Sequence, residues 1–312
     1  MLRGKTATIQ EILDSAPMSG LQVGVLVLCA LVGVLDGYDT QVIAVGAASI
    51  AKALDIPAVS MGYAITAGLG GAAIGALAVG QFADRSGRKG ALIGATLTFA
   101  IFTIATAFAT SLPVLIAFRF LAGVGLGGAA PCFVALASEY TPKRRRAAFA
   151  SIVWSSFALG VMIGGLSNGY ILAHLPWPVI FYIGGGGGLV VAALLFVFLP
   201  ESMEFLAGRT DSQAKLIATI RRLLPAFDEQ TRVIATPMES APLKQLFTEQ
   251  RRATTLLLWV ISFTCFGTLA SMNYIPLILQ QHGVSVGAAA VALSFLGSGA
   301  LVGTSIDRKS VV

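Results

Sequence analysis

The sequence predicts an all-α integral membrane protein made of a six-helix bundle, a polar linker and two further helices. Of the 312 residues, 56% are hydrophobic and only 12% are charged, whereas charged residues make up about a quarter of a soluble domain. The mean hydropathy is +0.82. Apolar stretches of about 20 residues, the length at which a helix crosses the hydrocarbon core, recur along the chain.

The transmembrane helices follow in order from these apolar stretches. We expect them over residues 20–46, 60–83, 90–109, 112–137, 147–173, 178–199, 253–279 and 285–305. The polar first 20 residues lack the apolar core and small-residue cleavage site of a signal peptide, so we expect an amphipathic cytosolic segment there. The longest polar interval then divides the chain into an N-terminal six-helix bundle (1–199), a cytosolic linker (200–252) and an incomplete C-terminal bundle of two helices (253–312).

The basic residues predict the orientation in the membrane. Of the 21 Lys and Arg residues, only Lys52 and Arg119 lie outside the amino terminus, the loops after the second, fourth and sixth helices, and the carboxyl tail. Because Lys and Arg collect on the cytosolic side, both ends are expected in the cytoplasm. The net charge of +6 then reflects topology and contact with anionic lipid headgroups, and not nucleic-acid binding.

The three cysteines give no disulfide framework. Cys29, Cys132 and Cys265 each fall within a predicted span, where a thiol behaves as a small buried hydrophobe. We find no nucleotide-binding loop, metal-ligand cluster or nucleophile triad, so we expect neither an enzyme nor a cofactor nor a metal site.

A short motif occurs twice at corresponding places. GQFADRSGRK (80–89) follows the second helix, and GTSIDRKS (303–310) follows the eighth; both contain Gly-x-x-x-Asp-Arg. Internal repeats are typical of secondary transporters. The repeat predicts that six helices in the first half have six counterparts, so we expect the chain to be interrupted after the eighth helix. A truncated product with no transport activity stays open as an alternative.

These motifs resemble the major facilitator superfamily. The loop at 80–89 carries the family's Gly-x-x-x-Asp-Arg-x-Gly-Arg-Lys pattern in full; "RFLAGVGLGGAAP" from Arg119, "SEYTPKRRR" after the fourth helix and "PES" after the sixth also look like the family. More narrowly, "LDGYDTQ" at 35–41, preceded by "ILDSAPMSGLQ", resembles the aromatic acid:proton symporters. The resemblance implies a major facilitator-type helical bundle, monomeric, in the bacterial inner membrane, that imports benzoate or hydroxybenzoate anions together with a proton. Transport of another organic anion or of a sugar is the alternative.

Three charged residues inside predicted helices are the candidates for proton coupling and substrate binding. Asp36 and Asp39 are three apart and share one helix face. By the helical rise, the two aspartates lie about 10–15 Å inside the outer end of the first helix and Arg119 lies about 10 Å deep in the fourth, so the three charges are at similar depth. Intramembrane ionisable groups usually pair or line a water-filled path, and neighbouring carboxylates favour protonation of one of them. Arg119 offers a planar fork to a carboxylate. The alternative is a buried pair that only fixes helix packing.

The Asp-Arg motif, residues 80–89, is interpreted as gating machinery. Its residues are Gly80, Asp84, Arg85, Gly87, Arg88 and Lys89, with Gly303, Asp307 and Arg308 in the second copy. The resemblance implies that the motif aspartate latches the cytosolic gate against a helix of the second half. Glu139 and Arg144 form a second charged cluster near it, although a charge run beside a membrane is usually an orientation signal.

The remaining candidates are weaker. Asn273 and Tyr274 in "SMNYIPLIL" are possible pocket residues in the seventh helix, which Pro276 should kink; a packing role for Tyr274 is the alternative. The five glycines 184–188 predict either a flexible kink or a close helix contact. An intramembrane aspartyl protease is disfavoured, because Tyr38-Asp39 lacks the Gly-x-Gly-Asp partner such sites use.

Overall fold

The computed structural model describes residues 6–15, 17–224, 232–234 and 247–310. The order of elements is β1 (Thr6–Thr8), α1 (Ile9–Ser15), α2 (Gly20–Ala53), η1 (Ala58–Ser60), α3 (Met61–Ser86), α4 (Arg88–Thr106), α5 (Leu112–Glu139), η2 (Lys143–Arg145), α6 (Arg146–His174), α7 (Pro178–Phe198), α8 (Met203–Ala207), η3 (Thr210–Ser212), α9 (Gln213–Leu223), β2 (Arg232–Ile234), α10 (Glu249–Met272), α11 (Ile275–Gln281) and α12 (Val286–Ser310). The predicted helical membrane bundle is confirmed, with one short strand pair added to it.

Six of the described helices, α2 to α7, are long and apolar enough to cross a membrane, and Val286–Ala300 in α12 is a shorter apolar helix. The span expected at 253–279 is wrong as a single helix, because α10 ends at Met272 and α11 begins at Ile275. Pro276 lies in the first turn of α11, where its missing N–H costs nothing but prevents a continuous helix.

The six long helices pack in a pattern that relates the first three to the second three. α2 packs along α6 as α3 packs along α5, and α2 contacts α7 as α4 contacts α5. α12 lies along α6 at the side of this bundle, while α11 contacts α2. The bundle therefore has the pairing expected of two three-helix repeats.

Small residues let the paired helices approach closely. A Cβ atom added to Gly71, Gly75, Gly123 or Gly127 would collide with backbone atoms of the facing helix in the α3–α5 pair. Such small-residue contacts replace the hydrophobic driving force that is missing between helices in lipid. The glycine motifs noted in the sequence therefore specify packing.

The glycine run in α7 is a contact surface and not a kink, since α7 is continuous from Pro178 to Phe198. Gly185 and Gly188 face Ala100 of α4 at distances too short for a Cβ, and Gly184 faces the ring of Tyr38. The structure thus favours the close helix contact over the flexible segment.

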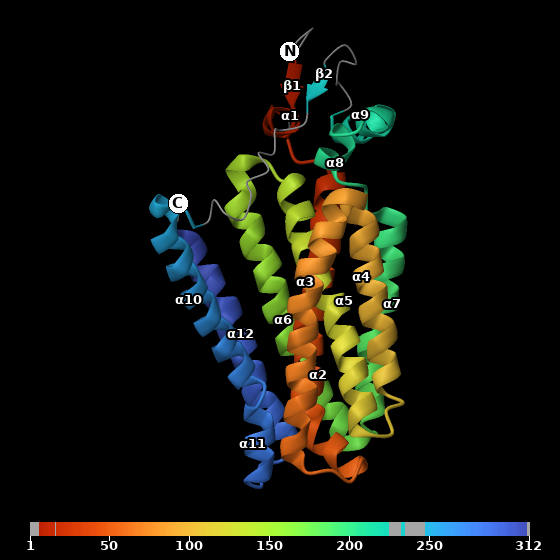
Figure 1. The fold of residues 1–312 in the computed structure, drawn as a ribbon, viewed down its shortest axis with the longest axis vertical. Helices are drawn as coiled ribbons and strands as arrows, with labels where there is room; N and C mark the ends of the chain where they lie inside the picture. Colours follow the sequence, from red (N-terminus) through yellow and green to blue (C-terminus); the bar gives the residue numbers. More distant parts are fainter. Residues whose placement is uncertain (1–5, 16, 225–231, 235–246, 311–312) are drawn as a thin grey trace.

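The amino-terminal segment packs against the segment that follows α7. β1 pairs in parallel with β2 through Thr6↔Arg232, Ala7↔Val233 and Thr8↔Ile234. Buried side chains of α1 and α9 belong to the same hydrophobic cluster: Ile9, Ile12, Leu13, Leu216, Ile220 and Leu223. Both segments lie at one end of the bundle, beyond the ends of the long helices (Figure 1).

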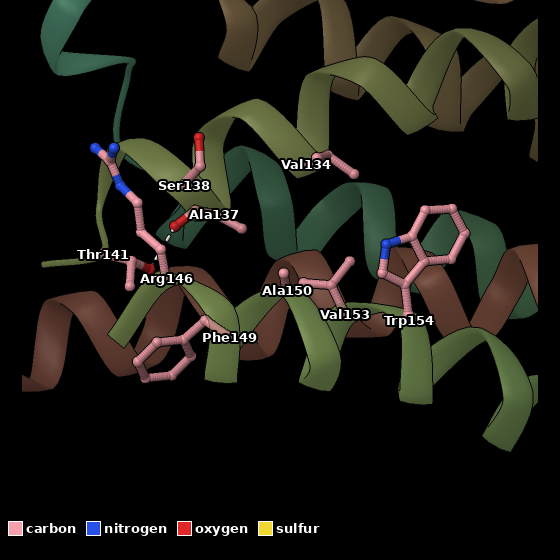
Figure 2. Close-up of a pocket in the computed structure, with 9 residues that line it drawn as sticks. All are labelled: Val134, Ala137, Ser138, Thr141, Arg146, Phe149, Ala150, Val153 and Trp154. Atoms are coloured by element: carbon pink, nitrogen blue, oxygen red, sulfur yellow. Dashed lines mark hydrogen bonds between the residues drawn. The ribbon is translucent and has the colours of Figure 1, made fainter. Parts of the chain in front are cut away.

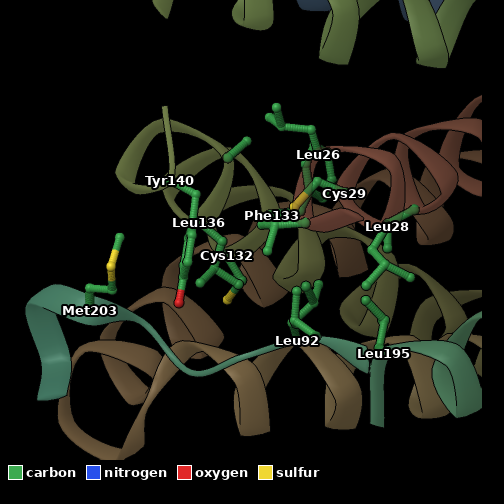
Figure 3. Close-up of a cluster of buried hydrophobic side chains, with 14 of the residues drawn as sticks. Leu26, Leu28, Cys29, Leu92, Cys132, Phe133, Leu136, Tyr140, Leu195 and Met203 are labelled. Atoms are coloured by element: carbon green, nitrogen blue, oxygen red, sulfur yellow. The ribbon is translucent and has the colours of Figure 1, made fainter. Parts of the chain in front are cut away.

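The same cluster continues into the helical bundle, where it includes Cys29, Cys132, Leu136, Tyr140 and Met203 (Figure 3). All three cysteines are free thiols, and Cys29 and Cys132 are buried as expected. Burial was the wrong expectation for Cys265, which is exposed on α10.

Candidate functional site

An ion pair between Asp39 of α2 and Arg119 of α5 lies inside the bundle. Arg119 Nη1 donates to Asp39 Oδ1 at 3.1 Å and Nη2 donates to Oδ2 at 2.5 Å. The side chains are only 4% (Arg119) and 7% (Asp39) exposed. Two parallel charge-assisted hydrogen bonds give the geometry that an arginine fork makes with a carboxylate. Counting residues from the helix ends placed both groups at similar depth, and the structure brings them into contact.

The guanidinium of Arg119 has further capacity for ligands. Its central carbon lies 5.9 Å from the ring centroid of Phe181 on α7, within the range of a cation–π contact. Its Nε is buried and has no hydrogen-bond partner among the described residues. An unpaired buried donor beside an aromatic ring is a feature that a carboxylate ligand would satisfy.

Asp36 lies one turn before Asp39 on α2 and stays outside this pair. The residue as a whole is of intermediate burial, and its main-chain carbonyl accepts a hydrogen bond from the Thr40 hydroxyl at 3.0 Å. Among the described residues its carboxylate makes no ion pair. The structure therefore joins two of the three candidate charges and leaves the third outside the ion pair.

A second polar contact near the pair was missed from the sequence. Tyr38 donates from its hydroxyl to Asn168 Oδ1 on α6 at 2.9 Å, and Asn168 is fully buried. An amide in the middle of an apolar span was the signal that could have found it, because intramembrane polar residues usually have partners. The bond ties α2 to α6 immediately beside Asp39.

The Asp-Arg motif joins α3 to α4 by a sharp turn. Gly87 has φ of +105°, in the region that favours glycine, and a Cβ there would contact the Glu201 carboxylate. Arg88 forms ion pairs with Asp84, at 3.5 Å, and with Glu139. The structure thus brings together the motif and Glu139, as the sequence suggested.

Glu201, which precedes α8, completes this cluster and was not predicted. Its Oε1 accepts from the main-chain N–H of Lys89 at 2.9 Å, so a carboxylate caps the first turn of α4, where the helix dipole favours negative charge. Ser202 donates to Glu139 Oε2 at 2.6 Å. Acceptor contacts of this kind leave no spacing pattern in a sequence.

Tyr140 lies between these groups. Its hydroxyl donates to the main-chain carbonyl of Glu201 at 2.6 Å. Burial raises the pKa of the Tyr140 phenol, because a low dielectric disfavours the phenolate. The hydroxyl therefore remains a hydrogen-bond donor at physiological pH.

Other members of the motif stay peripheral. Arg85 is exposed, and its carbonyl accepts from Arg209 at 2.9 Å. Arg144 is exposed and has no hydrogen bond or ion pair within the described residues. Gly80 lies in α3, and a Cβ atom added to it would lie 3.8 Å from its nearest neighbour, the side chain of Pro131. The second copy of the motif lies within the helix α12, which includes Gly303, Asp307 and Arg308.

The two candidates for a pocket in the seventh span lie at the break between α10 and α11. Asn273 is buried. The Tyr274 hydroxyl lies 3.2 Å from Thr66 Oγ1 and 3.3 Å from the carbonyl of Gly62, to which it donates. Tyr274 therefore contacts α3, which is the packing alternative raised from the sequence.

A shallow groove lies elsewhere, between the end of α5 and the start of α6 (Figure 2). Its cavity volume is about 60 Å³, far below the ~300 Å³ of a typical small-molecule pocket. The lining is Val134, Ala137, Ser138, Thr141, Arg146, Phe149, Ala150, Val153 and Trp154. It contains none of the three intramembrane charges, so we do not assign substrate binding to it.

Comparison with known proteins now identifies the family. Residues 29–310 match the model of the Major Facilitator Superfamily. The chain belongs to this superfamily. Membership confirms the expected transporter fold and excludes the protease alternative. The chain is 33% identical over 313 residues to the gallate transporter of Pseudomonas putida, covering 97% of this chain and 69% of the relative. It is 32% identical over 316 residues to the 4-hydroxybenzoate transporter PcaK of the same species, covering 98% of this chain and 70% of the relative.

Among solved structures, a partially occluded inward-open form of the xylose transporter XylE from E. coli superposes with a TM-score of 0.75 at 20% identity. The match covers 94% of this chain and 71% of that chain. At this identity the likeness concerns the fold alone. It supports the helix pairing described above for a superfamily member.

Proposed function

We propose that this superfamily member imports aromatic carboxylates, such as hydroxybenzoates, in symport with a proton. The observation that carries the proposal is the buried bidentate pair of Asp39 and Arg119, with an unpaired Nε on the same guanidinium. Relatives at 31–33% identity are named gallate and 4-hydroxybenzoate transporters, and their substrates are anions with a carboxylate and an aromatic ring.

The pair provides a simple exchange mechanism. A substrate carboxylate that binds the Arg119 fork replaces the Asp39 carboxylate as its partner. Asp39 is then a buried carboxylate without its cation, a state whose electrostatic cost is removed by protonation. Binding of the anion and uptake of the proton are therefore coupled through one guanidinium. The Phe181 ring beside Arg119 supplies an aromatic surface for the substrate ring.

Asp36 serves as the entry point for the proton in this scheme. It lies one helical turn from Asp39 and outside the ion pair with Arg119, so it is placed to pass a proton to Asp39 without losing a cationic partner of its own. Asn273 at the α10–α11 break is the candidate for a polar contact with the far side of the substrate.

The Asp-Arg motif acts as part of the cytosolic gate in this proposal. Its turn is tied to α5 through Arg88 and Glu139 and to the segment before α8 through Lys89 and Glu201. We further propose that the protein is a monomer in the bacterial inner membrane with both ends cytoplasmic. Its units are the bundle 1–199, the linker 200–252 and the region 253–312.

Uptake into proteoliposomes tests the proposal. Labelled benzoate, 4-hydroxybenzoate, gallate and xylose are offered with an inward proton gradient, with and without a protonophore. We expect gradient-dependent accumulation of the aromatic acids and none of xylose. Accumulation of xylose, or uptake of aromatic acids that the protonophore leaves unchanged, would contradict it.

A further inference from the structure

A line of hydrogen bonds runs from the start of α2 to the Asp-Arg motif. Gln22 Nε2 donates to the carbonyl of Tyr140 at 2.8 Å. The Tyr140 hydroxyl donates to the carbonyl of Glu201 at 2.6 Å. The Glu201 carboxylate in turn accepts from the Lys89 main-chain N–H at 2.9 Å. Four segments far apart in the sequence are thus joined in series.

The line is shielded from water at its first two members. Gln22 is 3% exposed and Tyr140 is fully buried, and the Tyr140 ring lies in the hydrophobic cluster beside Leu136, Cys132 and Met203 (Figure 3). When a buried polar group loses its hydrogen-bond partner, the free energy rises by its uncompensated desolvation cost. Breaking a hydrogen bond of this line therefore costs more than breaking an exposed one, and the four segments are held in one arrangement.

The segment before Gln22 is fastened to the same region. Asp14 Oδ1 accepts from the main-chain N–H of Lys143 at 2.8 Å, Arg146 hydrogen-bonds to Gln10, and Arg145 contacts the Met18 sulfur at 3.2 Å. The turn between α5 and α6 is thereby held against the amino terminus. Tyr140 lies at the start of that turn.

Gln22 also has a separate, local task. With Ser19 it forms a capping box: Gln22 Oε1 accepts from the Ser19 N–H at 2.8 Å, and the Ser19 hydroxyl accepts from the Gln22 N–H. Glutamate serves equally well at this position of a capping box. The side chain therefore uses its oxygen for the helix cap and its nitrogen for Tyr140, and one substitution separates the two.

We propose that Gln22 and Tyr140 are positioning residues of the cytosolic gate, which hold Glu201 on the first turn of α4 and so make the amino-terminal segment part of the gating machinery. The inference rests on the proposed gating role of the Asp-Arg motif. The two links made by Gln22 and Tyr140 are hydrogen bonds between neutral groups, so they differ from the ion pairs of the motif itself.

Two isosteric variants remove single links of the line. Gln22→Glu keeps the cap acceptor for Ser19 but places an oxygen where the donor to Tyr140 stood. Tyr140→Phe keeps the buried ring and removes the hydroxyl. Tyr63→Phe is the matched control, because Tyr63 is 68% exposed. Glu139→Gln is the reference that disturbs the motif directly.

Two buried thiols report whether the cluster around Tyr140 loosens. Cys132 and Cys29 are buried in the cluster that contains Tyr140, and the exposed Cys265 is replaced by serine in every variant. We measure the rate at which N-ethylmaleimide alkylates the buried thiols of the full chain in liposomes. We expect about fivefold faster alkylation in Tyr140→Phe, the effect of losing one net hydrogen bond. Gln22→Glu should show at least the same increase, because its buried carboxylate also faces the Tyr140 carbonyl, and Tyr63→Phe should show no change.

Two further readouts separate positioning from a general loss of structure. The double variant Gln22→Glu/Tyr140→Phe should react little faster than either single variant, because links of one series are not additive. Aromatic-acid uptake should lose Vmax at unchanged KM, since Arg119 is untouched. If both single variants kept the wild-type alkylation rate and uptake while Glu139→Gln was alkylated faster, the inference about Gln22 and Tyr140 would be overturned. The gating role of the Asp-Arg motif would then still stand. Unchanged alkylation in Glu139→Gln would overturn the gating role and the inference with it.

Discussion

Replacing Asp39 by asparagine leaves Arg119 as a buried cation without its counterion. The asparagine oxygen can keep one of the two hydrogen bonds seen at 3.1 and 2.5 Å, but its amide nitrogen then faces a guanidinium donor. Removing one partner of a buried ion pair costs about 3–5 kcal/mol. The side chains here are 4% and 7% exposed, so water offers little compensation, and we expect a loss in this range.

The loss is measured by thermal unfolding in detergent. For a large chain each kcal/mol lowers Tm by about 2 °C or more, so Asp39→Asn should lower Tm by about 6–10 °C. Asp84→Asn is the matched control: Asp84 is 63% exposed in its pair with Arg88, and such surface pairs contribute about 0–1 kcal/mol.

The double variant Asp39→Asn/Arg119→Gln completes the experiment. It removes both charges and leaves two amides that can hydrogen-bond, so most of the lost stability should return, as when a buried pair is replaced as a unit. If Asp39→Asn unfolded no earlier than Asp84→Asn, or if the double variant were less stable than the single one, the reasoning about the buried pair would be refuted.

Three further changes test the packing and the turn, each followed by thermal unfolding. Gly71→Ala should destabilise the protein by about 1–3 kcal/mol, because the added Cβ meets the backbone of α5. Its control, Gly94→Ala, has open space around it and should be neutral or slightly stabilising. Equal Tm values for the two variants would count against the close α3–α5 contact. Tyr38→Phe should cost about 1–3 kcal/mol by leaving the buried Asn168 amide without its partner; an unchanged Tm would show that this bond does not stabilise the fold. Gly87→Ala should cost about 1–3 kcal/mol, because φ of +105° strains a residue with a Cβ; a wild-type Tm would argue against the sharp turn.

Hydropathy predicted the long helices well, because the requirement that backbone groups be satisfied inside lipid leaves helix as the available structure for long apolar stretches. It could not predict the contact of β1 with β2, since three-residue strands have no periodicity and the partners are more than 200 residues apart. The docking of the amino-terminal segment was missed for the same reason.

The site was predicted in part. Depth along the helices placed Arg119 level with both aspartates, but residues three apart share a face, so the sequence could not decide that Asp39 and not Asp36 forms the pair. Tyr140 and Glu201 were missed as functional candidates because their contacts use main-chain carbonyls and N–H groups, which every residue carries.

The exchange of Asp39 for a substrate carboxylate on Arg119 is the central claim, and proton-driven uptake tests it most directly. Proteoliposomes with wild-type protein or Asp39→Asn are given labelled 4-hydroxybenzoate, first under an inward proton gradient and then in exchange against unlabelled substrate without a gradient. We predict that the wild type accumulates substrate and that Asp39→Asn still exchanges it but no longer accumulates it. Gradient-driven accumulation by Asp39→Asn at the wild-type level would contradict the account.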